Sequence, residues 1–166
     1  MPGAAVLEAI AFIRGLQASP ITRTLSQGSA PPYGRAVADA GFDVLILCAS
    51  EFQPPAKLFP GVRVIHCDID DAPMSQEIWT RARSAAQEAA ACIQRGDRVL
   101  STCAFGWNRS GLVDAMIQHE VEGISGAEAV RRIRAKQPGA LTNASFVRAL
   151  KAVPAIPRRS RSSTSK

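Results

Sequence analysis

The sequence predicts a single α/β domain with a largely parallel central sheet of four to five strands flanked by helices. Short, continuous runs of branched apolar residues, such as "DVLILCAS" at 43–50, are typical of strands that are buried on both faces. Between these runs lie longer stretches in which apolar residues recur every three or four positions, as expected for helices that cover a sheet. Because strands and helices alternate along the chain, a parallel sheet is favoured over separate helical and β parts.

The first part of the chain predicts a helix, a strand and a short second helix. The stretch "AAVLEAIAFIRGL", residues 4–16, carries Glu8 within its apolar pattern and has no cationic residue before it. It therefore indicates an amphipathic helix rather than a secretion signal. We expect a strand at 21–25 ("ITRTL"), a turn-rich segment at 26–34 ("SQGSAPPYG") and then a short helix that Gly41 ends.

The middle of the chain predicts three more strands and a long helix. Strands are expected at 43–50, at 62–69 ("VRVIHCDI") and at 98–102 ("RVLST"), and the first and last of these are expected to be buried. The helix between the last two covers 75–95, where Ser75 is the expected N-cap and alanines dominate the apolar face.

The last part of the chain predicts three helices. The first follows residue 109 and ends at Gly123. Ser125, with Glu128 three residues later, has the spacing of a capping box that opens the second. The third helix begins after either Thr142 or Asn143, both of which are suitable N-caps.

Length and charge limit the domain number and the partners. At 166 residues the chain is long enough for one domain with a sizeable core, which we assign to 1–155. The net charge of +6 arises mostly from the last ten residues, which hold four basic residues and no acidic one, so the rest of the chain carries only +2. We expect 156–166 to be a disordered basic tail. Because that tail has no interleaved aromatic residues, we expect no nucleic-acid partner.

Apolar runs and cysteine spacing exclude further classes. No apolar run reaches the ~18 residues that a membrane span needs, so we expect no membrane insertion and a cytoplasmic protein. The cysteines at 48, 67, 92 and 103 form no CxxC pair, which argues against a zinc ribbon or a disulfide framework. We therefore predict reduced thiols, no metal and no cofactor, and the sequence predicts no particular oligomeric state.

The segment "STCAFGWNRSG" at 101–111 places Cys103 six residues before Arg109, at the end of a predicted strand. The spacing alone is a weak signal. Its context is stronger, because ligands bind beyond the carboxyl ends of parallel strands and a following helix presents free N–H groups to an anion. Gly106 lets the backbone turn inward, the planar guanidinium of Arg109 matches a phosphate, and the same field favours a Cys103 thiolate. The segment predicts a thiolate nucleophile facing a phosphoryl group, with a buried structural cysteine as the alternative.

Such chemistry also needs a proton donor for the leaving group. The segment "DIDDAP" at 68–73 supplies three carboxylates after the predicted strand at 62–69. Any of these carboxylates, Asp68, Asp70 or Asp71, could act as the general acid.

The order of these residues resembles the dual-specificity branch of the cysteine-dependent protein tyrosine phosphatases. That family has Cys, five residues, Arg, then Ser or Thr, and an acidic Asp at a similar distance upstream; here Asp71 stands 32 residues before Cys103. The similarity runs from "QGSAPP" to "NASFVRAL" and includes "DVLILCASE" and "GISGAEAVRRIR". It implies a cysteine phosphatase-like fold and hydrolysis of phosphoserine, phosphothreonine or phosphotyrosine on phosphoprotein substrates, without a metal, through a cysteinyl-phosphate.

The resemblance implies a role for each site residue. Cys103 would be the nucleophile, Arg109 the phosphate clamp, and Asp71 the general acid and then base. Ser110 would hydrogen-bond the thiolate, and Asn143 would support the loop. The backbone amides that would line the phosphate-binding loop belong to Ala104, Phe105, Gly106, Trp107 and Asn108.

Thr102 departs from the family pattern, which has His at that position to order the loop. We expect the Thr102 hydroxyl to supply part of that loop support and the site to be active. Two other functions stay open. One is phosphoinositide or RNA 5′-phosphate hydrolysis, whose enzymes usually carry cationic loop residues that "AFGWN" lacks. The other is a phosphate-binding pseudophosphatase, suggested by Thr102.

Cys48 lies near the end of the predicted strand at 43–50, and Cys103 directly follows the predicted strand at 98–102. In a sheet of the family's type these two strands are neighbours, at a separation that a disulfide can bridge. The phosphatase-and-tensin branch resembles this chain at "LCASE" and uses the matching cysteine to capture the oxidised nucleophile. Cys48 is therefore either a redox partner of Cys103 or an inert buried residue.

Overall fold

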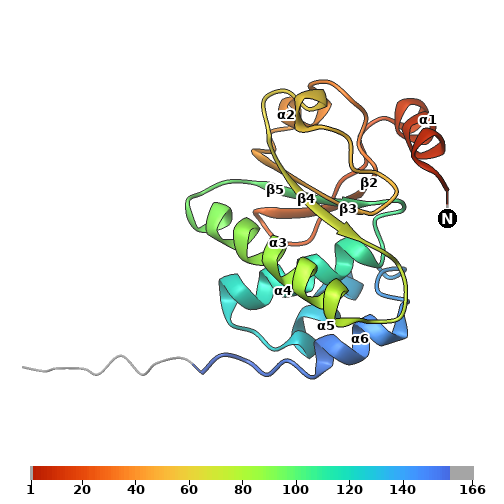
Figure 1. Cartoon of the computed structure of the whole chain (residues 1–166). Coiled ribbons are helices and arrows are strands. Elements are labelled where there is room, and N and C mark those ends of the chain that lie inside the picture. The colour runs from red at the N-terminus through yellow and green to blue at the C-terminus, as the bar shows by residue number, and fades with distance from the viewer. Residues whose placement is uncertain (1, 158–166) are drawn as a thin grey trace, which may run out of the picture.

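The computed structural model describes residues 2–157, which build one five-stranded sheet covered by helices (Figure 1). The strand order is β1-β2-β5-β3-β4, in which β1 pairs antiparallel with β2 and every other pair is parallel. The predicted fold class is thus confirmed. The strands are β1 (Ser19–Pro20), β2 (Leu25–Ser29), β3 (Val44–Ala49), β4 (Arg63–Ile69) and β5 (Val99–Cys103).

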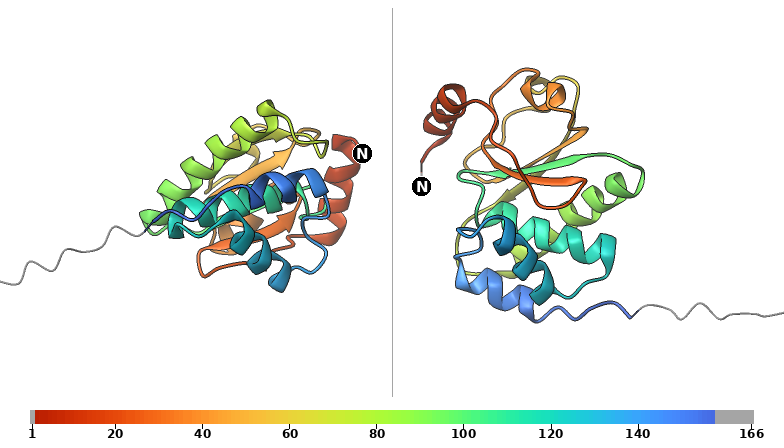
Figure 2. Two further views of the ribbon diagram at one scale, coloured as in Figure 1. Left: turned by 90° about the horizontal axis from the view of Figure 1, so that it is seen from below. Right: turned by 180° about the vertical axis from the view of Figure 1, so that it is seen from behind.

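The helices lie on both sides of the sheet. α3, α4, α5 and α6 gather on one side, and α1 and α2 lie on the other (Figures 1 and 2). This arrangement leaves β3 and β5 buried on both faces, which explains their continuous apolar sequences. The helices are α1 (Ala4–Arg14), α2 (Ala36–Asp39), α3 (Gln76–Gln94), α4 (Arg109–Glu122), α5 (Gly126–Lys136) and α6 (Ala144–Lys151), with a short 3₁₀ helix at Ala56–Leu58.

The first long strand lies later in the sequence than predicted. Instead of a strand at 21–25, the backbone N–H groups of Ile21 and Thr22 both donate to Leu25 O, which closes a tight turn. β2 then occupies the start of the segment predicted as turn-rich, and it pairs in parallel with β5 from Leu25↔Val99 onward. The prediction was wrong because "LSQGS" is poor in strand-forming residues, and it is the pairing with β5 that fixes its conformation.

Helix α4 is the centre of the larger helical layer. Every residue from Arg109 to Gln118 is buried, because α4 packs against β5 and lies between α3 and α5. α3 faces it with alanines, including the fully buried Ala82, Ala86 and Ala89, so the two helices approach closely. Each fully buried Leu, Ile or Val side chain in this layer stabilises the fold by about 1.5–3 kcal/mol.

Side-chain caps begin three helices where the sequence predicts them. Ser75 accepts a hydrogen bond from Ile78 N at the start of α3, and Ser125 accepts one from Glu128 N at the start of α5. Asn143, rather than Thr142, caps α6 by accepting hydrogen bonds from the backbone N–H groups of Ser145 and Phe146. These three helix starts are confirmed.

The chain beyond α6 returns to the end of α4. Ile156 N donates to Gly123 O at 2.9 Å, so a residue that the sequence analysis places in the tail contacts the end of α4. The remainder of the predicted tail, 158–166, lies outside the described residues. Within residues 2–157, none of the helices has the length and apolar character required to cross a bilayer.

Candidate active site

A tight loop, residues 104–108, joins the end of β5 to the start of α4. None of its five backbone N–H groups donates to another backbone group in residues 2–157. Unpaired N–H groups at a helix start favour anions, both as donors and through the helix dipole. Gly106 has φ 72°, and a Cβ there would lie 2.7 Å from the backbone of Gly28 on β2. Only glycine therefore allows the loop to lie this close to the sheet.

Gln27 holds the loop from behind. Its side chain is fully buried on β2, and Nε2 donates to Gly106 O at 2.6 Å and to Ser110 Oγ at 3.1 Å. One amide thus joins the turn of the loop to the first turn of α4. Sequence reasoning missed Gln27 because it assigned residue 27 to a turn.

Cys103 and Ser110 face each other across the loop. The Cys103 Sγ and Ser110 Oγ atoms are 3.4 Å apart, and both residues are buried. A hydroxyl at this distance can donate a hydrogen bond to a thiolate. The structure thus brings these two predicted site residues together.

Arg109 is buried and paired with Glu51. Its side chain is 2% exposed, and its two terminal nitrogens donate to the two Glu51 carboxylate oxygens at 2.5 and 2.7 Å. Burial alone would lower the pKa of Arg109, but the bond to Glu51 and the nearby Cys103 and Asp71 raise it above its ordinary value. Burial likewise opposes ionisation of Glu51, whose pKa is nevertheless lowered by the bond from Arg109. Both members of the pair are therefore charged, and the guanidinium is fixed beside the loop.

Glu51 is a site residue that sequence reasoning did not assign. It follows β3 by two residues, so it lies at the carboxyl end of a buried strand, where polar residues of α/β proteins meet ligands. That position was the available signal. The resemblance at "LCASE" includes the residue without giving it a role.

Asp71 is the carboxylate of "DIDDAP" that lies against the loop. Its two oxygens accept hydrogen bonds from Asn108 Nδ2 at 2.9 Å and Asn143 Nδ2 at 2.8 Å. The two alternatives are engaged elsewhere. Asp70 accepts a hydrogen bond from Ser50, and Asp68 pairs with Arg81 on α3. Of the three carboxylates, Asp71 is therefore the one that the structure brings to the loop.

The Thr102 hydroxyl does not take the place of a loop-ordering side chain. It donates to Ile46 O on β3 at 2.9 Å, so its hydrogen bond joins two strands. This differs from the expectation that Thr102 supports the loop. The support comes instead from Gln27 on one side and from Asn143, whose backbone N–H donates to Asn108 Oδ1, on the other.

Cys48 lies in the interior beside the loop. The last matched pair of β3 and β5 is Leu47↔Thr102, so Cys48 is next in line with Cys103. Burial raises the pKa of the Cys48 thiol well above its ordinary value, and its neighbours Cys67, Cys103 and Asp114 raise it further. All four cysteines of the chain are free thiols.

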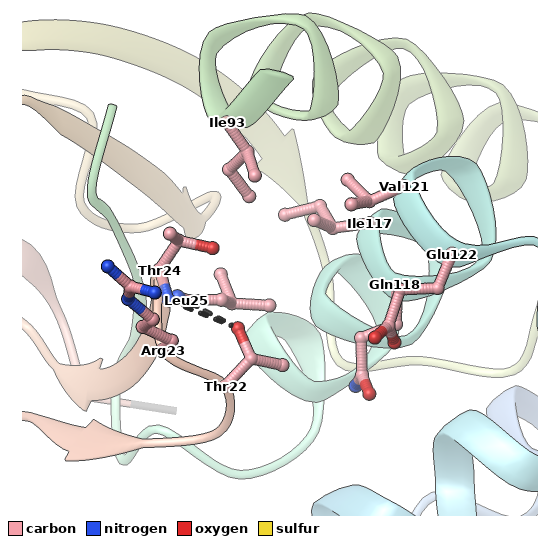
Figure 3. A pocket seen from close by; sticks show the side chains of 9 residues that line it. All are labelled: Thr22, Arg23, Thr24, Leu25, Ile93, Ile117, Gln118, Val121 and Glu122. Atoms are coloured by element: carbon pink, nitrogen blue, oxygen red, sulfur yellow. Dashed lines mark hydrogen bonds between the residues drawn. The ribbon is translucent and has the colours of Figure 1, made fainter. Parts of the chain in front are cut away.

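The hollows of the surface differ in their chemistry. The hollow in Figure 3, about 220 Å³, lies at the opposite end of α4, and its lining, with residues such as Thr22, Ile117 and Glu122, contains no cysteine. Another, of about 250 Å³, adjoins the loop, whose Phe105 and Trp107 are half exposed beside it. Residues 2–157 contain no cluster of side chains suited to hold a metal ion.

Comparisons with known proteins agree on the fold. No protein-family model matches the sequence, and no curated protein matches it. Among solved structures, human DUSP28 superposes with a TM-score of 0.68 at 23% identity, over 81% of this chain and 90% of that one. Tk-PTP in its active form gives 0.65 at 22% identity, over 81% and 95%. A human tyrosine phosphatase-like serine/threonine/tyrosine-interacting protein gives 0.67 at 20% identity, over 81% and 93%. The chain has the fold of the dual-specificity phosphatases.

Proposed function

We propose that this chain is a cysteine-dependent phosphatase that hydrolyses phosphoserine, phosphothreonine or phosphotyrosine monoesters on proteins. The observation that carries the proposal is the meeting of four side chains around one anion-binding loop. Cys103 and Ser110 are 3.4 Å apart, Arg109 is fixed by Glu51, and Asp71 is tied to loop residue Asn108. No metal is needed, because the loop N–H groups and Arg109 can neutralise the phosphoryl charge.

In the first step the Cys103 thiolate attacks phosphorus while the bond to the leaving oxygen breaks. Arg109 and the N–H groups of residues 104–108 bind the three equatorial oxygens. Asp71 gives its proton to the leaving alcohol or phenol and becomes a carboxylate. The products are the free hydroxyl compound and a cysteinyl-phosphate.

In the second step a water molecule attacks the phosphorus of the cysteinyl-phosphate. Asp71 takes a proton from that water, and the sulfur–phosphorus bond breaks. The departing thiolate is stabilised by a hydrogen bond from Ser110, whose oxygen is held by Gln27. Phosphate leaves and the starting state of the site returns.

The test is turnover of p-nitrophenyl phosphate in the presence of a chelator. We expect Cys103→Ser to abolish turnover while phosphate binding remains. Arg109→Ala should lower kcat/KM by about 10²–10³-fold or more, because a principal transition-state donor is lost. Cys92→Ser, on α3 and away from the loop, is the matched thiol control and should keep its activity. Full activity of Cys103→Ser, or inhibition by the chelator, contradicts the mechanism.

A substrate panel identifies the class of monoester. Phosphoserine, phosphothreonine and phosphotyrosine peptides should be hydrolysed faster than a phosphoinositide or an RNA with a 5′-phosphate, because loop residues 104–108 carry no cation. The reverse preference favours the alternative substrates. Phosphate binding without any turnover favours a pseudophosphatase. Cys103→Ser should also capture phosphoproteins from a lysate.

A further inference from the structure

We propose that the side chains of Asn108 and Asn143 are positioning residues that hold Asp71 as the proton donor at the edge of the loop. This inference rests on the proposed phosphatase function and adds two side-chain amides to its machinery. The three residues come from distant parts of the sequence: the segment after β4, the loop before α4 and the segment before α6.

The three residues form a closed ring of two side-chain hydrogen bonds and one backbone hydrogen bond. Asn108 Nδ2 donates to Asp71 Oδ2 at 2.9 Å, and Asn143 Nδ2 donates to Asp71 Oδ1 at 2.8 Å. The ring closes because Asn143 N donates to Asn108 Oδ1 at 2.9 Å. A backbone N–H can only donate and a carboxylate can only accept, so the orientation of the Asn108 amide follows from its partners.

The anchors of the ring are themselves fixed. Asn143 Oδ1 caps α6, and Asn143 Nδ2 also donates to Ala72 O at 3.0 Å, next to Asp71 in the sequence. Asn108 is the last residue of the loop before Arg109, so its side chain moves with the phosphate-binding backbone. The position of the acid is thereby linked to the position of the loop. Asp71 itself is exposed, so packing alone would not hold it.

This arrangement suits a group that gives up a proton and then takes one back. Each carboxylate oxygen has two lone pairs, and the amides occupy one on each oxygen, which leaves a lone pair to carry the proton toward the leaving group. When Asp71 donates its proton, the two N–H groups stabilise the carboxylate that forms. They also keep it in place for the attacking water. A displacement of 1 Å in such a group can cost about 10²-fold in rate.

The kinetic test compares leaving groups. Asn108→Ala removes one donor. Asn143→Ser shortens the other side chain so that it no longer reaches Asp71, and it keeps an oxygen to cap α6. Each variant should lower kcat on phenyl phosphate by about 3- to 100-fold and change kcat on 2,4-dinitrophenyl phosphate, which needs no acid, by less than about 2-fold. Inhibition by inorganic phosphate should stay unchanged. Gln87→Ala, the loss of an exposed amide on α3, is the control and should leave both rates unchanged.

The positioning role requires that the effect pass through Asp71. In an Asp71→Asn background, Asn108→Ala should therefore add no further loss on phenyl phosphate. A loss of the same size in both backgrounds overturns the inference. So does a rise in the phosphate inhibition constant that equals the fall in kcat/KM, because Asn108 would then serve only the loop.

A second measurement does not depend on turnover. The chain contains only two asparagines, so selective ¹⁵N-asparagine labelling gives two side-chain amide pairs in an NMR spectrum. Asp71→Ala should shift both pairs, and Asp70→Ala should shift neither. Unshifted amide signals in Asp71→Ala overturn the inference even for an active enzyme. If the wild type lacks turnover while both pairs shift, the proposed function fails and the positioning of Asp71 stands.

Discussion

Two clusters of polar residues each include residues of helix α4. They differ in how far their polar groups have hydrogen-bond or ion-pair partners. The loop cluster, at the start of the helix, consists of Gln27, Glu51, Cys103, Arg109 and Ser110, and every charge in it has a partner. The inner cluster lies deeper and consists of Cys48, Ser101 and Asp114. Within residues 2–157, the two carboxylate oxygens of Asp114 and the Ser101 hydroxyl have no hydrogen-bond partner. One helix thus carries a fully paired arginine and, five residues later, an unpaired acid.

The presence or absence of a partner determines whether a buried titratable group is ionised or neutral. A charge can remain in the interior when an opposite charge and hydrogen bonds replace the lost water, as Glu51 does for Arg109. Without such a partner a buried acid keeps or takes up a proton. Burial raises the pKa of Asp114 well above its ordinary value, and a nearby Ser101 opposes this only in part. The loop cluster therefore holds an ionised pair, and the inner cluster consists of neutral groups.

Breaking the ion pair of the loop cluster should have the largest effect on stability. Glu51→Gln leaves the Arg109 guanidinium buried without an opposite charge, so we expect the free energy of unfolding to fall by about 3–5 kcal/mol. Urea denaturation by circular dichroism measures it. Glu77→Gln removes the exposed partner of Arg81 and is the control, for which no measurable change is expected. Equal stability of the two variants would mean that the buried pair contributes no more than a surface pair.

Removing the unpaired acid should instead stabilise the protein. The pKa of the Asp114 carboxyl is higher in the folded chain than its ordinary value of 3.8, which applies to the unfolded chain. Such a carboxyl favours folding fully when the pH is below the unfolded pKa. It loses that contribution as the pH rises through the folded pKa. At neutral pH Asp114 is therefore a net cost. Asp114→Asn keeps the shape and removes the titration, so we expect a gain of about 1–3 kcal/mol at pH 7 that shrinks to nothing below about pH 4.

The pH series of unfolding free energies is the deciding measurement for Asp114. Asp39→Asn, at an exposed site on α2, is the matched control. A gain that is the same at pH 4 and pH 7 would show that Asp114 does not titrate differently in the folded chain.

The sequence predicts the elements and residues whose signals are local. β3, β4 and β5 have continuous or alternating apolar runs, and the starts of α3, α5 and α6 have capping side chains a few residues from their partners. Cys103 and Arg109 are six residues apart, so one motif contains both. Each of these features depends on neighbours that are visible in a short window.

The residues that support the site could not be predicted because their partners are far away in sequence. Gln27 bonds to a carbonyl 79 residues later, and Glu51 pairs with an arginine 58 residues later. Polar residues such as these are typical of turns and surfaces when only their neighbours are considered. The pairing of β2 with β5, itself non-local, brings Gln27 to the loop. The sequence therefore indicates the groups that we propose to react, and it does not indicate most of the residues that hold them in place.

The last prediction is that oxidation links the two clusters through a disulfide between Cys48 and Cys103. Of the changes considered, the Cys48 substitution should have the smallest effect on the enzyme before oxidation. Peroxide converts the Cys103 thiolate to a sulfenic acid, and the Cys48 thiol can then displace water to form a disulfide that dithiothreitol reduces. Cys48 is in line with Cys103 on the adjacent strand, and adjacent strands lie about 4.8 Å apart. Cys48→Ser should change kcat by less than about 2-fold, because its side chain does not take part in the reaction steps.

After peroxide, the loss of Cys48 should make inactivation harder to reverse. Without a capturing thiol, the sulfenic acid proceeds to sulfinic acid, which dithiothreitol does not reduce. We expect recovery of most activity in the wild type and in Cys67→Ser, and recovery of less than about half in Cys48→Ser. Because Cys48 also neighbours Cys67, peptide mapping must distinguish the two pairings. A Cys48–Cys103 disulfide links the clusters. A Cys48–Cys67 disulfide, or full recovery in Cys48→Ser, leaves Cys48 a neutral thiol of the interior, separate from the chemistry of the loop.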